Sequence, residues 1–107
     1  MNMSTQLIIN TTFVVEPSAL ADFIQWATDM CVPAARAAVG CSDALLLRII
    51  PSNDDEQPSY ALQVRTISPE AAHEWLQGPF RMLLGAFYSE HKREHLLYFI
   101  TMMEVMA

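Results

Sequence analysis

Residues 43–67 have the sequence DALLLRIIPSNDDEQPSYALQVRTI, which contains two strand-like runs separated by one acidic loop. The first run, Ala44–Ile50, is almost continuously apolar, and the second, Tyr60–Ile67, alternates apolar and polar side chains. Between them, Pro51–Pro58 is rich in turn-forming and charged residues, which is typical of a solvated loop. Two strands without a helix between them predict an antiparallel pair.

Helical patterns flank this pair on both sides. From Pro17 onward, apolar residues recur at the spacing of one buried helical stripe. Pro33 falls inside the stripe, and because proline clashes with the preceding turn, we expect the helix to kink or stop there. Ser68–Pro69 is a strong helix start, and Gly78–Pro79 should interrupt this second helix.

Strand-like runs also lie near both ends of the chain. Leu7–Val15 alternates, and its more apolar odd positions should face the helices while its even positions face away. The last apolar run is Leu96–Met106. The order βαββαβ predicts an α+β, ferredoxin-like fold: a four-stranded antiparallel sheet in the order 4-1-3-2, with two helices on one face. Residues 1–107 are expected to form one domain.

Composition limits the classes of partner. The formal net charge is −6, and the six basic residues are scattered along the chain. Without a basic patch, binding to nucleic acid or to an anionic membrane is not expected. The N-terminus lacks the pattern of a signal peptide, and no apolar run approaches the length of a membrane span, so we expect a cytoplasmic protein. Cys31 and Cys41 should be reduced and buried.

One short motif suggests metal chemistry, but its context argues against it. His91-Lys-Arg-Glu-His95 matches the H-x-x-E-H pattern of zinc proteases. The segment lies where the second helix leads into the last strand, and no third ligand is evident. A solvated connector is therefore the expected role, and neither a metal nor a cofactor is predicted.

Polar residues on three strands form the sharpest candidate site. Alternation puts Asn10 with Thr12 and Gln63 with Arg65, and pairing of the first and third strands would gather them on the helix-free side. Arg48 is expected to join them there. This face is either exposed and wet, or covered in a dimer or by a small ligand. The interspersed apolar residues favour a covered face, where polar groups need partners.

Two tryptophans lie beside polar helix positions. Trp26 is close to Gln25 and Asp29, and Trp75 follows Glu74. Exposed tryptophans are enriched where proteins meet partners. Tryptophans at the edge of a helix also cover the rim of a core, and this second interpretation is the one we favour.

The uncovered sheet face predicts self-association. Two helices cover one face, so the other would be an exposed apolar patch of several hundred Å², which is large for a monomer. Burying it against a second copy uses the same patch twice. We therefore expect a homodimer through the sheet face that buries more than about 1,000 Å² in total.

The whole chain resembles a family of small bacterial proteins, well represented in Bacteroidetes, that is classed as a domain of unknown function. The resemblance rests on Asn10-Thr-Thr12, Trp26, Val32-Pro33, Tyr60-Ala-Leu-Gln63 and Thr101. The family looks like a member of the dimeric α/β-barrel group, whose ferredoxin-like domains pair through their sheets. This chain differs at three positions, because relatives tend to have tyrosine, histidine and arginine in place of Ile9, Cys31 and Ile100.

The resemblance implies two classes of function. The first, which we favour, is a homodimer without catalysis that binds itself and a small molecule or a protein. The second is an enzyme similar to the cofactor-independent or haem-degrading monooxygenases of this fold group, whose sites use asparagine, tryptophan and histidine between helices and sheet. Asn10, Trp75 and His73 or His91 are the candidates here. The expected orientation of Asn10, away from the helices, counts against this second class.

Overall fold

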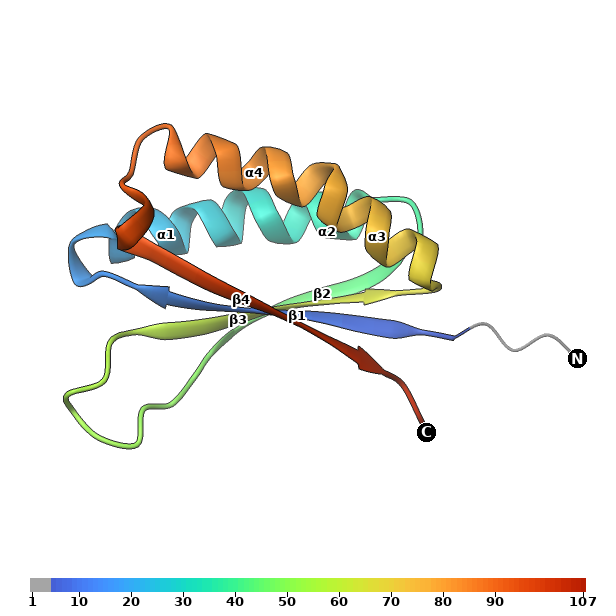
Figure 1. Cartoon of the computed structure of the whole chain (residues 1–107), viewed down its shortest axis with the longest axis horizontal. Coiled ribbons are helices and arrows are strands. Elements are labelled where there is room, and N and C mark those ends of the chain that lie inside the picture. The colour runs from blue at the N-terminus through green and yellow to red at the C-terminus, as the bar shows by residue number, and fades with distance from the viewer. Residues whose placement is uncertain (1–4) are drawn as a thin grey trace, which may run out of the picture.

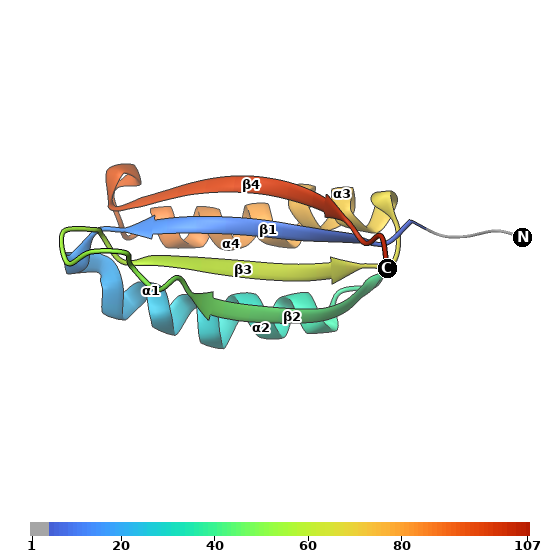
Figure 2. The same cartoon turned by 90° about the horizontal axis from the view of Figure 1, so that it is seen from below.

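The order of helices and strands is βαββαβ in the computed structural model, which describes residues 5–107 (Figure 1). The strands are β1 (Leu7–Val15), β2 (Cys41–Arg48), β3 (Ser59–Thr66) and β4 (Leu96–Glu104). The helices are α1 (Leu20–Trp26), α2 (Val32–Ala37), α3 (Pro69–Gln77) and α4 (Pro79–Tyr88). All four helices lie on the same face of the sheet (Figures 1 and 2). The predicted ferredoxin-like fold is confirmed.

The sheet has the order β2-β3-β1-β4, and every neighbouring pair is antiparallel. This is the predicted order, with β1 and β3 in the centre. Asn10 of β1 lies opposite Gln63 of β3 on one side and opposite Thr101 of β4 on the other. The alternation of β1 is also as predicted, because its odd positions are the buried ones: Ile9, Thr11, Phe13 and Val15.

The first helical segment contains an irregular turn immediately before Pro33. A short 3-10 turn, Pro17–Ala19, leads into α1, and a π-helical turn, Ala27–Cys31, separates α1 from α2. Within it the Val32 amide donates to the Ala27 carbonyl, five residues earlier. Proline has no N–H to continue the ladder, so a change of hydrogen-bond register next to it is physically reasonable. Regular α-helix stops where the sequence predicted a kink or stop.

The second helical segment begins and breaks where the sequence predicted. The Ser68 side chain caps α3 by accepting a hydrogen bond from the Ala71 amide at 3.1 Å. Gly78, with φ −107° and ψ −95°, separates α3 from α4, and Pro79 starts the new helix. No helix among residues 5–107 is long and apolar enough to cross a membrane.

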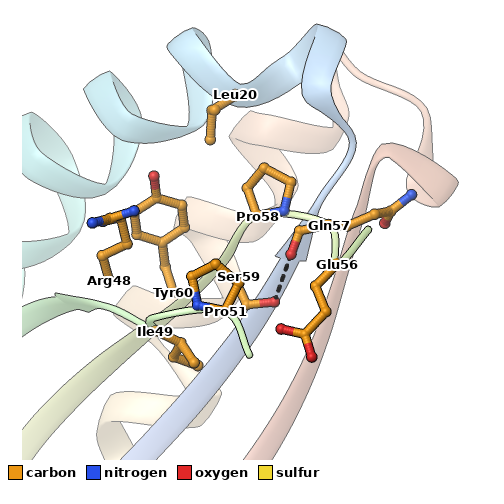
Figure 3. Close-up of a pocket in the computed structure, with 9 residues that line it drawn as sticks. All are labelled: Leu20, Arg48, Ile49, Pro51, Glu56, Gln57, Pro58, Ser59 and Tyr60. Carbon is orange, nitrogen blue, oxygen red and sulfur yellow. Dashed lines mark hydrogen bonds between the residues drawn. The ribbon is translucent and has the colours of Figure 1, made fainter. Parts of the chain in front are cut away.

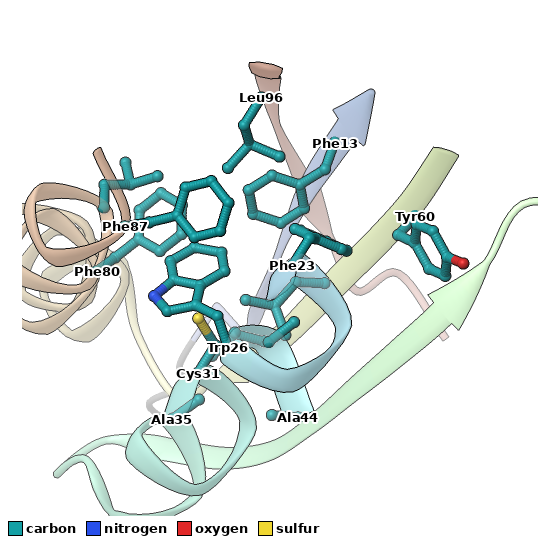
Figure 4. Packing of buried hydrophobic residues seen from close by; sticks show 14 of the residues in the cluster. Phe13, Phe23, Trp26, Cys31, Ala35, Ala44, Tyr60, Phe80, Phe87 and Leu96 are labelled. Carbon is teal, nitrogen blue, oxygen red and sulfur yellow. The ribbon is translucent and has the colours of Figure 1, made fainter. Parts of the chain in front are cut away.

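Aromatic rings fill the space between the helices and the sheet (Figure 4). Phe13 projects from β1, and its ring centroid lies 5.1 Å from that of Phe23 and 5.9 Å from that of Trp26. Trp26 in turn packs on Phe87 of α4, with centroids 5.0 Å apart. One cluster therefore joins the central strand to both helical segments.

Gly40 occupies a position that only glycine tolerates. Its φ is +83°, and a Cβ built there would lie 2.5 Å from the Cβ of Ala71 in α3. We therefore expect Gly40→Ala to lower the free energy of unfolding by about 2 kcal/mol or more, from the left-handed backbone and the clash together. Urea denaturation followed by circular dichroism measures this change.

Gly85 provides the matched control, because the same substitution should have the opposite effect there. It is exposed within α4, and nothing lies within 4 Å of its built Cβ. Gly85→Ala should raise stability by about 0.5–1 kcal/mol, since alanine favours the helix. Equal effects at the two sites would contradict the structure around Gly40.

Candidate functional site

One face of the sheet carries no helix among the described residues, and we call it the open face (Figure 2). Cross-strand partners share a face, so the register defines its members. They are Ile8, Asn10, Thr12 and Val14 of β1, Ser59, Ala61, Gln63 and Arg65 of β3, Asp43, Leu45 and Leu47 of β2, and Leu97, Phe99, Thr101 and Met103 of β4.

A polar row crosses the centre of this face, formed by Thr12, Asn10, Gln63 and Thr101, and side-chain hydrogen bonds join the first three of these residues. Asn10 Nδ2 donates to Thr12 Oγ1 at 3.1 Å, and Gln63 Nε2 donates to Asn10 Oδ1 at 3.2 Å. Thr101 lies directly opposite Asn10 in β4. The sequence prediction that Asn10, Thr12, Gln63 and Arg65 share the helix-free face is therefore correct. Arg65 lies near the end of the face, opposite Asp43 of β2.

Large apolar side chains surround the polar row. Phe99, Leu97 and Leu45 are 60%, 50% and 48% exposed, and Leu47 and Met103 are exposed as well. Exposed apolar side chains on both edge strands of one face, β2 and β4, are more than a monomer usually leaves in water. The arrangement is suited to covering by another apolar surface, with the polar row providing hydrogen-bonding groups at its centre.

Arg48 does not join the polar row, contrary to the prediction. It is the cross-strand partner of Tyr60, and Tyr60 is opposite Phe13, so both lie on the helix-covered side of the sheet. Tyr60 is buried and packs on Phe23, with ring centroids 5.3 Å apart. Arg48 and Tyr60 instead line a small pocket near the start of α1 (Figure 3).

Both tryptophans are buried in the core, as the favoured interpretation expected, and neither is an exposed residue of the kind that the alternative required. Trp26 is 8% exposed, and its Nε1 donates to the Leu83 carbonyl of α4 at 3.1 Å. Trp75 is 1% exposed and packs near Phe80, with centroids 6.0 Å apart. The indole nitrogen of Trp75 is buried without a hydrogen-bond partner in the described part of the chain.

The H-x-x-E-H segment is a connector, as the sequence predicted. His91 lies in a bend, and residues 93–95 form a short 3-10 turn before β4, so continuous helix is absent between the two histidines of the motif. Residues 5–107 contain no group of three or more histidine, cysteine, aspartate or glutamate side chains arranged to hold a metal. Cys31 is fully buried, and desolvation raises the pKa of its thiol to about 12, while Cys41 is only partly buried.

A groove of about 610 Å³, which no sequence pattern predicted, lies on the helical face between α1 and the end of α4. His91 stacks on Phe87 at 4.2 Å between centroids, and its Nε2 lies 3.4 Å from Asp22 Oδ2. This contact ties the end of α4 to α1. Asp22 and His91 lie far apart in the sequence, and their spacing gives no signal that they meet.

A family model described as Domain of unknown function (DUF4286) matches residues 6–106, which is nearly the whole chain. The chain belongs to the DUF4286 family. The predicted resemblance to a domain of unknown function is thereby confirmed. No curated protein matches the DUF4286 chain in sequence.

Solved structures share the fold of the DUF4286 chain at low sequence identity. A conserved protein of unknown function from Bacteroides thetaiotaomicron is 12% identical with a TM-score of 0.71, covering 95% of this chain and 99% of its own. A Deinococcus radiodurans protein, named as a proposed antibiotic biosynthesis monooxygenase, is 17% identical with a TM-score of 0.71, covering 94% and 93%. A haem degrader from Mycobacterium tuberculosis, with two haems in its active site, is 18% identical with a TM-score of 0.65, covering 94% and 96%. These likenesses confirm the fold resemblance.

Ile9, Cys31 and Ile100 were singled out in the sequence as departures from the family resemblance, and they differ in burial. Ile9 and Cys31 are fully buried in the core, where apolar side chains pack well. Ile100 is 42% exposed on the helical side of β4 and lines a shallow groove with Phe80 and Tyr98. Ile9 and Ile100 lie diagonally across the neighbouring strands β1 and β4 on the helix-covered side of the sheet, and Cys31 belongs to the same core cluster as Ile9.

Proposed function

We propose that this DUF4286 protein is a homodimeric binding module whose two copies associate through the open face. The observation that carries the proposal is the composition of that face, where a hydrogen-bonded polar row is surrounded by exposed apolar side chains such as Phe99 and Leu45. A symmetric pair would bury the same surface on both copies, which is the commonest geometry of homo-oligomers.

The exposure of β4 supports the same arrangement. Eight of its nine residues are exposed, and Leu96 alone in this strand is buried. Tyr98, Ile100 and Met102, on the helical side, are 37%, 42% and 45% exposed, so the helices cover this edge strand incompletely. A long, apolar edge strand left in water is an aggregation risk that proteins usually cover. A second copy that contacts β4 and the open face would cover both the exposed edge strand and the exposed apolar side chains of that face.

Sedimentation equilibrium at micromolar concentration tests the proposal. We expect about twice the chain mass of 12.0 kDa. Amide hydrogen exchange, compared between a concentrated sample and one diluted until the mass falls to that of one chain, should show protection of β1 and β4 that depends on association. A clean monomer at micromolar concentration would overturn the proposal.

Asn10→Ala should weaken the dimer by about 1–3 kcal/mol. The change removes the acceptor of the Gln63 amide and the donor to Thr12, and a polar group left unpaired in a covered interface bears its full desolvation cost. Sedimentation equilibrium of the variant measures the change in dissociation constant. Gln57→Ala, in the exposed loop between β2 and β3, is the control and should leave it unchanged. An unaltered constant for Asn10→Ala would argue for a solvated polar row.

A second candidate function is a monooxygenase-type enzyme, which the names of several fold neighbours favour. Two observations favour the binding module over it. The space between helices and sheet is packed with aromatic rings, and Asn10 lies on the opposite side of the sheet. Haem titration distinguishes the enzyme from the binding module. Haem binding to an enzyme of this type should change both the haem absorbance and the fluorescence of buried Trp75. We expect neither change.

A further inference from the structure

Arg48 and Tyr60 line a small pocket on the helix-covered side of the sheet, at the end of the β2–β3 hairpin (Figure 3). Its volume is about 210 Å³. The walls are largely apolar and are formed by Leu20, Ile49, Pro51 and Pro58. The pocket lies on the helix-covered side, whereas the polar row lies on the other face, and Ser59 is the one lining residue that also belongs to the open face.

Two hydrogen-bond donors in the pocket, the Arg48 guanidinium and the Tyr60 hydroxyl, form no hydrogen bond with the other lining residues. The hydrogen bond drawn among the lining residues runs from Ser59 Oγ to the Gln57 carbonyl at 3.3 Å, and neither Arg48 nor Tyr60 takes part (Figure 3). Tyr60 is 9% exposed as a whole residue, whereas Arg48 is exposed. Among residues 5–107 the guanidinium of Arg48 forms no ion pair.

The remaining charges restrict what the pocket can hold. Glu56 accepts hydrogen bonds from the Ser52 amide at 3.0 Å and the Ser52 hydroxyl at 2.6 Å, and these bonds lower the pKa of its carboxyl. Its carboxylate is turned away from Arg48 and Tyr60 in Figure 3. Asp54 and Asp55 follow in the same exposed loop. A ligand with a second negative charge near this loop would be repelled.

We propose that this pocket binds a small aliphatic monocarboxylate, with its carboxylate held by Arg48 and Tyr60. The planar guanidinium matches a carboxylate in a bidentate pair, and a tyrosine hydroxyl donates to the same anion. Leu20, Ile49 and Pro58 provide the apolar wall for a short hydrocarbon tail. The geometry thus selects one negative charge on an apolar body.

Titration of the ¹⁵N-labelled full chain with sodium butyrate, at constant ionic strength, tests this site. We expect saturable shifts of the Leu20, Ser59 and Tyr60 amide signals, which surround the pocket. Butyramide, which lacks the charge, and succinate, which carries a second one, should bind about tenfold more weakly. No saturable shift with butyrate, or equal binding of butyramide, would overturn the proposal.

Substitutions of Arg48 and Tyr60 test whether these two residues bind the carboxylate. Arg48→Gln should weaken butyrate binding about tenfold or more, and Tyr60→Phe, which keeps the packed ring, by about threefold to tenfold. Arg81→Gln is the matched control, because it removes the same charge from an exposed position of α4 outside the pocket and the open face, and it should leave the dissociation constant unchanged. Equal losses in the Arg48 and Arg81 variants would show non-specific charge attraction and would reject the site.

Discussion

Replacing Phe13 with alanine should lower the free energy of unfolding by about 3–5 kcal/mol. Phe13 is fully buried at the middle of the aromatic cluster, and its ring contacts come from β4 and both helical segments. The substitution removes a large apolar volume that rigid neighbours cannot refill. Since a domain of this size is stable by only about 5–15 kcal/mol, the loss is a large fraction of the total.

Urea denaturation at several protein concentrations measures the effect and separates it from dimer formation. A defect in the core of one chain gives the same loss at every concentration, whereas a defect in association depends on concentration. Phe99→Ala is the control, because Phe99 is 60% exposed on the open face and its truncation creates no core cavity. A similar, concentration-independent loss in both variants would contradict the placement of Phe13.

Phe99→Asp should weaken the dimer more than 100-fold. The substitution puts a carboxylate next to the polar row, opposite Thr12, where a second copy would cover it. An unpaired charge buried in an interface costs about 3–5 kcal/mol, and each 1.4 kcal/mol is about tenfold in the dissociation constant. The fold of the single chain should change little, because Phe99 is largely exposed there.

The measurement is sedimentation equilibrium with circular dichroism as a check of the fold. Val39→Asp is the matched control, since Val39 is 90% exposed in the turn before β2, away from the open face, and the variant adds the same charge. We expect Phe99→Asp to sediment as one chain and Val39→Asp as two. Equal masses for both variants would reject the open face as the dimer surface.

The sequence correctly predicted the features of the fold that depend on neighbouring residues in the chain, namely strand alternation and helix boundaries. Strict alternation in Leu7–Val15 placed Asn10 and Thr12 on the correct face, and Ser68 and Gly78 marked helix boundaries correctly. Arg48 was misplaced because the run Ala44–Ile50 is apolar on both faces and gives no alternation to fix the orientation of its one charge.

The remaining errors and omissions concern contacts between segments that are distant in the sequence. Trp26 is buried because α4 lies against it, and the Leu83 carbonyl accepts its indole N–H. A helical stripe predicts which side faces the sheet and not which side faces a neighbouring helix. The stacking of His91 on Phe87 and its pairing with Asp22 likewise depend on how the helices pack.

In the proposed dimer, the polar row has a further consequence for any two DUF4286 chains that are produced in the same cell. Apolar surfaces attract one another in many relative orientations, whereas amide and hydroxyl groups restrict pairing to arrangements in which each donor meets an acceptor. Gln63 Nε2 and Thr12 Oγ1 each take part in one hydrogen bond within the chain, so a paralogue with different groups at these positions would leave the second N–H of Gln63 or the O–H of Thr12 unpaired in a mixed dimer. Co-expressed paralogues should therefore sort into like pairs, and heterodimers should fall below the proportion expected from random mixing.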